Sequence, residues 1–195
     1  MGRTAVKSRK TRETEVSISI DLDGAGKSAV STGVGFFDHM MELFSRHGLF
    51  DLTVEVRGDL NVDSHHTVED TGIVLGQAIR EALGDKLGVK RYGSSFVPMD
   101  ESLAFCALDL SSRPCLVFEG SLPAERVGEF ETGLVEEFFR AVAVNAAVTL
   151  HLKIMYGTNA HHMIEALFKA FARALSDASR IDERIKGVMS TKEVL

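Results

Sequence analysis

The sequence contains the order His-His-x-x-Glu twice, as SHHTVED at residues 64–70 and as AHHMIEA at residues 160–166. Within a helix, positions i and i+4 lie on one face, whereas adjacent positions are about 100° apart. Each motif therefore offers a clamp, made by its first histidine and its glutamate, and a lone histidine that points elsewhere. We expect the clamp of one motif to meet the lone histidine of the other. This predicts two metal sites: His65, Glu69 and His162 in one, and His66, His161 and Glu165 in the other.

The donor types indicate which ions could bind. Mixed imidazole and carboxylate donors suit divalent manganese, iron or zinc, and the lack of a thiolate argues against a structural zinc site. The sequence does not rank these ions. A polar helix start without any metal is the simpler explanation of one such motif. Two copies at matched positions weaken that explanation. Pure packing is a further difficulty for it, because burying unpaired imidazole and carboxylate groups costs several kcal/mol.

The repeat also predicts one further ligand for each site. His39 lies 19 residues before Gly58, and counting back 19 or 20 residues from Gly157 reaches Phe138 or Glu137, of which Glu137 can bind a metal. His39 and Glu137 are therefore candidate ligands, although a solvated helix carboxylate is the alternative for Glu137. His47 directly precedes a glycine where a helix is predicted to end, so it could either cap that helix or line a pocket.

Local patterns indicate the elements that must position these residues. Residues 14–22 alternate apolar and polar side chains, as in a half-buried strand, and a return strand near 27–32 would complete a hairpin. A helix over 34–48 and a strand over 49–58 follow. The next helix is predicted to begin at Asp63 or Ser64 and to end near Gly84 or Gly88. For residues 1–8, a frayed basic tail is one of two equally supported interpretations.

The same succession returns in the second half, with strands at 102–110 and 115–120, a helix at 134–147, a strand at 148–157 and a helix at 160–178. This predicts a duplication within a single body spanning residues 1–195: a first repeat over 9–90, a second over 91–186, and a C-terminal tail over 187–195. The expected fold class is α/β, of the α+β type. It is a duplicated hairpin-helix-strand-helix repeat in which two four-stranded mixed sheets enclose a four-helix layer.

Composition excludes several classes of protein. The 195 residues are 45% hydrophobic and 26% charged, as in ordinary globular chains, and no apolar run is long enough to span a membrane. The net charge of −6 argues against nucleic acid as a partner. The N-terminus lacks the apolar stretch of a secretory signal, so a cytoplasmic protein is expected. Cys106 and Cys115 are expected to be buried, unbridged thiols in a reducing compartment.

Longer stretches carry a resemblance to a known family. The motifs DSHHTVED, NAHHMIEALFKAFARAL, FFDHMMELFSRHGLFDL, RETEVSISIDLDG and STKEVL closely resemble imidazoleglycerol-phosphate dehydratase of histidine biosynthesis, from about Arg9 to the C-terminus. The resemblance implies a hydro-lyase that removes water from imidazole glycerol phosphate to give imidazole acetol phosphate. It also implies two Mn²⁺ ions per active site, which favour an imidazolate, and a homo-24-mer with active sites between subunits.

Carried over position by position, the resemblance places the metal ligands on His39, His65, His66, Glu69, His161, His162 and Glu165. Many family members have a further ligand histidine in VEHFF, where this chain reads VEEFF and places Glu137. The acid–base glutamate falls on Glu13, and His47 is a second acid–base candidate. The phosphate-binding groups fall on Arg91, Arg113, Lys169, Ser190 and Lys192. Glu193 replaces a glycine that is usual in the family, which would weaken the phosphate site unless its side chain points outward.

Two other classes of function compete with this interpretation. One is an iron-storing or iron-oxidising di-metal protein, whose sites use Glu-x-x-His on the helices of a bundle. This chain reverses that order, uses a spacing of four, and has strands between its helices. The other is a non-catalytic protein in which metal ions only join subunits. Dehydration of imidazole glycerol phosphate after addition of manganese would separate the enzyme from both alternatives.

Overall fold

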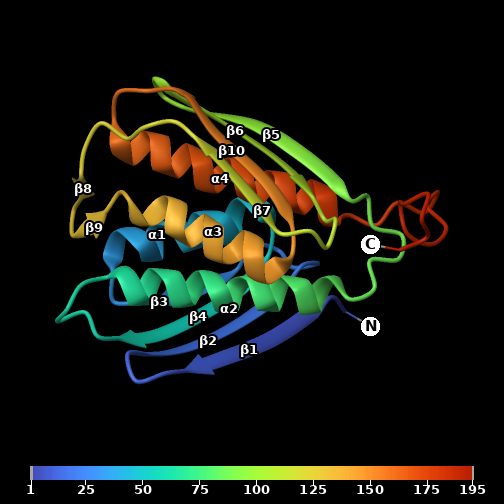
Figure 1. Ribbon diagram of the computed structural model, residues 1–195, viewed down its shortest axis with the longest axis horizontal. Helices are drawn as coiled ribbons and strands as arrows, with labels where there is room; N and C mark the ends of the chain where they lie inside the picture. Colours follow the sequence, from blue (N-terminus) through green and yellow to red (C-terminus); the bar gives the residue numbers. More distant parts are fainter. Residues whose placement is uncertain (1, 195) are drawn as a thin grey trace.

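Two four-stranded sheets lie on either side of four helices in the structure, a computed structural model that describes residues 2–194 (Figure 1). Met1 and Leu195, which begin the predicted body and end the predicted tail, lie outside the described residues. The first sheet has the order β1-β2-β4-β3, formed by Thr4–Lys10, Thr14–Asp21, Asp51–Gly58 and Ser28–Ser31. The second has the order β5-β6-β10-β7, formed by Tyr92–Met99, Ser102–Asp109, Thr149–Tyr156 and Cys115–Glu119.

The helices α1 (Gly35–Gly48), α2 (His65–Leu83), α3 (Leu134–Ala146) and α4 (Ala160–Ser179) form the layer between the sheets. Helix α2 packs on the first sheet and against α3, whereas α4 packs on the second sheet and against α1. A short hairpin of β8 (Arg126–Val127) and β9 (Phe130–Glu131) precedes α3. The two sheets have matching topologies, so the predicted duplicated two-sheet fold with its helical layer is confirmed.

The hairpin in each half is built from different strands than the sequence suggested. In the first half β1 pairs antiparallel with β2, so residues 4–10 form a strand rather than a frayed tail. The predicted return strand near 27–32 is β3, which pairs in parallel with β4. In the second half β6 likewise pairs with β5, and β7 pairs in parallel with β10. A helix connects β3 to β4, and such a crossover favours parallel pairing over a hairpin.

Apolar side chains from both sheets and all four helices meet in one core. Strand β2 buries every second residue, including Val16, Ile18 and Ile20, which is why its sequence alternates. Phenylalanines fill the space between the helices, where the rings of Phe44 and Phe171 stack with their centroids 5.5 Å apart. This packing fixes α1 against α4, an arrangement that positions His39 in the site.

A glycine allows each inner strand to pass close to the start of the following helix. A Cβ atom on Gly58 would lie 2.0 Å from Thr67 Oγ1, and one on Gly157 would lie 2.4 Å from Ser102 Oγ and 2.6 Å from Met163 Cγ. All three distances are far shorter than a van der Waals contact. The two glycines therefore bring the ends of β4 and β10 close to the two motifs.

The two cysteines differ in their exposure to solvent. Cys106 is buried, but Cys115 is exposed because it begins β7, an edge strand; the prediction that both thiols are buried was wrong for Cys115. Among the described residues, no helix combines the length and apolarity needed to cross a membrane.

Candidate active site

The two His-His-x-x-Glu motifs occupy the first turns of α2 and α4. Asn159 caps α4, because its Oδ1 accepts hydrogen bonds from the backbone N–H groups of His161 and His162. Ser64 occupies the cap position of α2 but makes no side-chain capping bond there; instead Asp63 accepts from the backbone N–H of His65 at 2.8 Å. The helix starts predicted from sequence are thus the elements that hold the proposed ligands.

The clamp on α4 is joined by a histidine from α1. The Nε2 atoms of His161 and His39 lie 3.2 Å and 3.6 Å from Glu165 Oε2, and one ligand atom from each of the three residues lies within 4.8 Å of the others. Glu165 is buried, and its Oε1 accepts from Lys169 Nζ at 2.5 Å. Burial raises the pKa of Glu165, but Lys169 and His39 lower it by more, so the net shift is downward and the group is a carboxylate at neutral pH.

The clamp on α2 is more open. His65 Nε2 lies 3.7 Å from Glu69 Oε2, and both side chains are nearly half exposed. His65 also lines a hollow of about 510 Å³ together with Glu137 from the first turn of α3. Glu137 otherwise contacts Arg140 at 4.0 Å. Glu137 thus lines the same hollow as His65, whereas His39 directly contacts Glu165 of the α4 clamp.

The lone histidines each face a carboxylate that the sequence analysis missed. His66 Nδ1 lies 3.1 Å from Asp59 Oδ2, and His162 Nδ1 lies 2.7 Å from Glu101 Oε2. Hydrogen bonds to Asp59 and Glu101 raise the pKa of His66 and His162 respectively. Asp59 is recognisable in the sequence as an acidic residue between a strand and the motif. Glu101 offers no such signal, since 61 residues separate it from His162.

Neither of the predicted three-residue metal sets is assembled within one chain. Among the described residues, only one group of three or more potential metal ligands has ligand atoms that converge. It consists of His39, His161 and Glu165. His162 lies with Glu101 rather than with the α2 clamp, and His66 lies with Asp59 rather than with the α4 clamp.

Glu13 lies in the turn between β1 and β2, beside the α2 motif. Its Oε2 is 3.9 Å from His66 Nε2. The turn is fixed because Thr11 Oγ1 accepts from the backbone N–H groups of Glu13 and Thr14, at 3.1 Å and 2.9 Å. Thr14 Oγ1 in turn donates to Asp70 on α2. The predicted acid–base glutamate is therefore held next to a proposed metal ligand.

His47 lies near the end of α1, close enough to Lys169 and Glu165 on α4 for their charges to act on its ring. It lines a small hollow of about 290 Å³ with Arg173 and Arg180. Burial lowers the pKa of His47, and the positive charges of Lys169 and Arg173 lower it further. The ring is therefore neutral at neutral pH and able to accept a proton.

Four of the five predicted phosphate-binding residues line one cavity of about 930 Å³: Arg91, Arg113, Ser190 and Lys192. Arg91 donates to Asp109 at 2.6 Å and to the backbone carbonyl of Met189 at 2.7 Å, which ties the C-terminal tail to the second sheet. The fifth residue, Lys169, lies instead beside Glu165. Glu193 has a left-handed φ of 60° and is not one of the residues lining the cavity.

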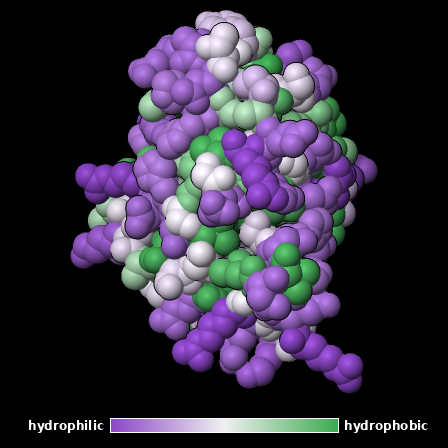
Figure 2. Space-filling model, turned by 90° about the vertical axis from the view of Figure 1, so that its left-hand side faces the viewer, coloured by the Kyte–Doolittle hydropathy of each residue, from purple (hydrophilic) through white to green (hydrophobic). Residues whose placement is uncertain are grey.

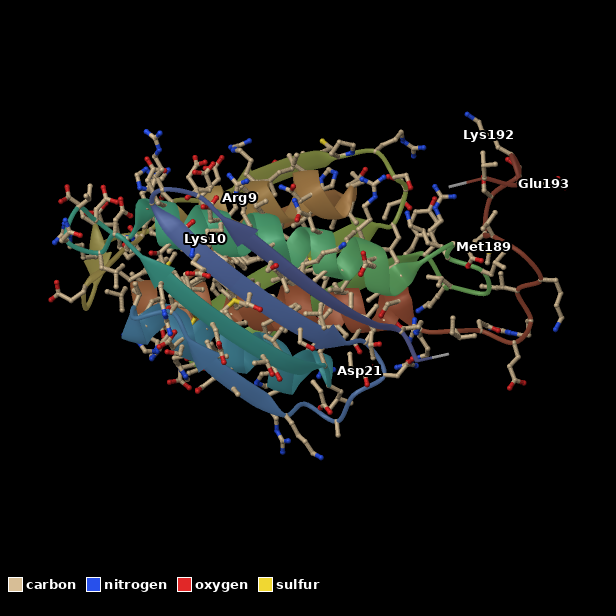
Figure 3. All side chains as sticks on the ribbon, turned by 90° about the horizontal axis from the view of Figure 1, so that it is seen from below. Arg9, Lys10, Asp21, Met189, Lys192 and Glu193 are labelled. Atoms are coloured by element: carbon tan, nitrogen blue, oxygen red, sulfur yellow. The ribbon has the colours of Figure 1, made fainter. Side chains whose placement is uncertain are left out.

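The residues of the two motifs and the residues of the basic cavity lie at opposite ends of the folded molecule. The starts of α2 and α4 lie at the left of Figure 1 and the tail lies at the right. Figure 3 shows the same separation, with Arg9 and Lys10, just before the Glu13 turn, far from Lys192. Helices of 19 and 20 residues span about 30 Å. The end that carries the motifs is mostly hydrophilic, with small hydrophobic patches (Figure 2).

Comparisons with known proteins agree on one family. Residues 32–175 match the family model described as imidazoleglycerol-phosphate dehydratase. The imidazoleglycerol-phosphate dehydratase of Acetivibrio thermocellus is 65% identical over all of both chains, and that of Clostridium acetobutylicum is 62% identical over 97% of this chain and 96% of its own. The crystal structure of the Staphylococcus aureus enzyme matches with a TM-score of 0.84 at 46% identity, covering 92% of this chain and 99% of its own. The crystal structure of the Pyrococcus furiosus enzyme in complex with (S)-C348 matches with a TM-score of 0.83 at 33% identity. The match covers 97% of this chain and 100% of its own.

The fold and these relatives define an enzyme of the dehydratase class, built on a duplicated α/β framework. Strands alternate with its helices, which does not favour the iron-storage alternative based on a helical bundle. The chain belongs to the imidazoleglycerol-phosphate dehydratase family of histidine biosynthesis, as the resemblance in its motifs predicted.

Proposed function

We propose that the chain removes water from imidazole glycerol phosphate to give imidazole acetol phosphate, using two divalent metal ions, of which manganese is the expected one. The observation that carries the proposal is the convergence of His39, His161 and Glu165, whose ligand atoms lie within 4.8 Å of one another in a member of this dehydratase family.

The donor sets suit such ions. Two imidazoles and a carboxylate at the start of α4 form a nitrogen and oxygen set without sulfur, which fits manganese, iron or zinc. His65, Glu69 and Glu137 offer a second set of the same chemistry around the hollow at the start of α2. The lone histidines would complete both sets across subunits: His66 would join the α4 clamp and His162 the α2 clamp.

The proposed chemistry needs an electron sink and two proton transfers. When bound, two divalent ions would withdraw electrons from the substrate's imidazole ring and favour its deprotonated form. A carbon proton must also be accepted, and a proton must be delivered to the departing hydroxyl oxygen. We assign these transfers to Glu13, which is held beside His66, and to the neutral ring of His47.

The cavity at the other end of the chain suits the substrate phosphate. Arg91 and Arg113 carry planar guanidinium donors, and Ser190 and Lys192 add a hydroxyl and an ammonium group. Lys169, beside Glu165, would supply a further positive charge from the metal-binding end.

The separation of the two ends favours active sites between subunits. One chain offers metal ligands and phosphate groups about 30 Å apart, too far for one small substrate to reach both. A homo-24-mer, in which the metal-binding end of one chain meets the tail of another, would complete each site. We also place the reaction in the cytoplasm, because free cysteines suit a reducing compartment.

Replacing Glu13 by Gln tests the assignment. Glu13→Gln should bind manganese and assemble as the unmodified protein does, but lose turnover by at least about a hundredfold. Glu15→Gln is the matched control, since Glu15 is an exposed carboxylate two residues away that pairs with Lys10; it should keep full activity. Full activity in Glu13→Gln would reject the role of Glu13. The absence of dehydration by the manganese-loaded unmodified protein would reject the proposed function itself.

A further inference from the structure

The two lone histidines of the motifs share a feature that the motifs themselves do not contain. In each ring, Nδ1 faces a carboxylate of the same chain: Asp59 lies 3.1 Å and 3.3 Å from His66 Nδ1, and Glu101 lies 2.7 Å from His162 Nδ1. An ionised carboxylate can only accept hydrogen bonds, so Nδ1 must carry the proton and donate. The lone pair of each ring is therefore on Nε2.

The two carboxylates come from different elements of the duplicated fold. Asp59 directly follows β4, whereas the residue that directly follows β10 is Gly157. The loop between β10 and α4 contains no acidic residue. In the second half the carboxylate comes instead from the turn between β5 and β6. The same contact is thus made twice by unrelated means, so it is not a simple inheritance from the duplication.

Glu101 is held firmly in place. Its Oε1 accepts from Asn159 N at 2.9 Å, from Thr158 N at 3.2 Å and from Ser102 Oγ at 2.9 Å. These bonds tie the β5–β6 turn to the start of α4 and leave Oε2 for His162. The carboxylate therefore fixes both the orientation of the ring and the nitrogen that carries the proton.

We propose that Asp59 and Glu101 are positioning residues, which hold His66 and His162 with Nε2 free to bind a divalent cation. This inference rests on the proposed function, because it assumes that the two histidines are metal ligands. Hydrogen bonds of this kind orient ligand histidines and raise their basicity, and losing one typically weakens metal binding about 10- to 100-fold.

Glu101→Gln tests the proposal with little change in shape. The amide oxygen can keep the four bonds now made to Oε1, which come from Asn159 N, Thr158 N, Thr158 Oγ1 and Ser102 Oγ, so the amide nitrogen then faces His162. Because that nitrogen is a donor, Nδ1 must become the acceptor and the proton must move to Nε2. Manganese binding, followed by the electron paramagnetic resonance signal of free Mn²⁺, should show a Kd about 10- to 100-fold higher at this site. Asp59→Ala should do the same for His66; alanine is used because both oxygens of Asp59 lie near Nδ1, so an asparagine could still turn its amide oxygen to the ring.

Glu42→Gln is the control for charge. Glu42 is an exposed carboxylate on α1 that is bonded to neither ring, so the substitution removes the same charge without touching Nδ1 or the proposed metal-binding Nε2. The Kd of this variant should change by less than about fivefold, because water screens an exposed charge. An equal loss in Glu42→Gln and Glu101→Gln would overturn the proposal, since charge alone would then explain both.

A second measurement does not need bound metal. The ¹⁵N chemical shifts of labelled histidine in the metal-free protein should place the His162 proton on Nδ1, and on Nε2 in Glu101→Gln. An unchanged proton position would overturn the proposal.

His162→Ala separates this inference from the proposed function. Unchanged manganese binding in His162→Ala would remove His162 from the ligands and so reject the ligand assignment of the proposed function. Weakened binding in His162→Ala together with an unchanged Kd in Glu101→Gln would reject only the positioning role of Glu101.

Discussion

The glutamates of the two motifs, Glu69 and Glu165, are equivalent in sequence but not in environment. The Glu69 side chain is 45% exposed and contacts His65, whereas the Glu165 side chain is 8% exposed and contacts Lys169, His161 and His39. We therefore predict that Glu165→Gln destabilises the metal-free protein much more than Glu69→Gln does.

The size of the difference follows from burial. Removing one partner of a buried ion pair costs about 3–5 kcal/mol, because the remaining charge is left without a counter-ion. The Lys169 side chain is 14% exposed and keeps some hydration, so we expect a cost of about 2–3 kcal/mol for Glu165→Gln. The exposed pair at Glu69 contributes about 0–1 kcal/mol. The two variants should thus differ by about 2 kcal/mol.

Urea unfolding at neutral pH, with a chelator present to remove divalent ions, measures both free energies of unfolding. A double-mutant cycle with Lys169→Met isolates the pair, and we expect a coupling of at least about 1 kcal/mol. Equal losses in the two glutamine variants, or a coupling near zero, would refute the argument. In that case Lys169 would be solvated well enough to need no partner.

Three further predictions test packing, titration and metal binding. Gly76→Ala should lower the free energy of unfolding, measured in urea, by about 1 kcal/mol. The Cβ atom of the alanine would lie 2.8–2.9 Å from atoms of α3. Overpacking of this kind costs about 1–3 kcal/mol and outweighs the higher helix propensity of alanine. Hydrogen bonds from the backbone N–H of Lys27 and of Ala25 lower the pKa of Asp51. The stability that these hydrogen bonds add is therefore present above the pKa of Asp51 in the unfolded chain, about 3.9, and is lost as the pH falls through its pKa in the folded protein. Thermal unfolding should show the unmodified protein melting above Asp51→Ala at neutral pH, and this difference should disappear in acid. Glu137→Ala should reduce the manganese bound per chain in a metal analysis, and an unchanged content would make Glu137 a surface residue.

The helices and the motifs could be predicted from the sequence because their signals are local. Apolar spacing in 34–48 and the glycine at its end define α1, and the acid or hydroxyl before His65 marks the start of α2. The strands β1 and β5 were missed. Residues 4–10 are mostly polar and bury only Ala5 fully, so they show no clear alternation and become a strand through pairing with β2.

Pairing partners and contacts distant in sequence could not be predicted in the same way. Residues 28–31 join β4 rather than β2, although a turn signal precedes them. His39 meets His161 because α1 packs against α4, and Glu101 meets His162 because the β5–β6 turn reaches the start of α4. The pairing of β3 with β4 spans 24 residues, and the two histidine contacts span more than 60, distances over which no periodic pattern carries information.

The sequence by itself determined the donors, their spacing and their duplication, because helical geometry places i and i+4 on one face wherever the helix lies. Only the tertiary structure decided that Glu165 is buried and Glu69 exposed, that each lone histidine faces a carboxylate, and that the basic cavity lies at the far end of the chain. The physical reason is that burial and convergence depend on which helix packs on which sheet, and that choice is made by the summed packing of the whole core.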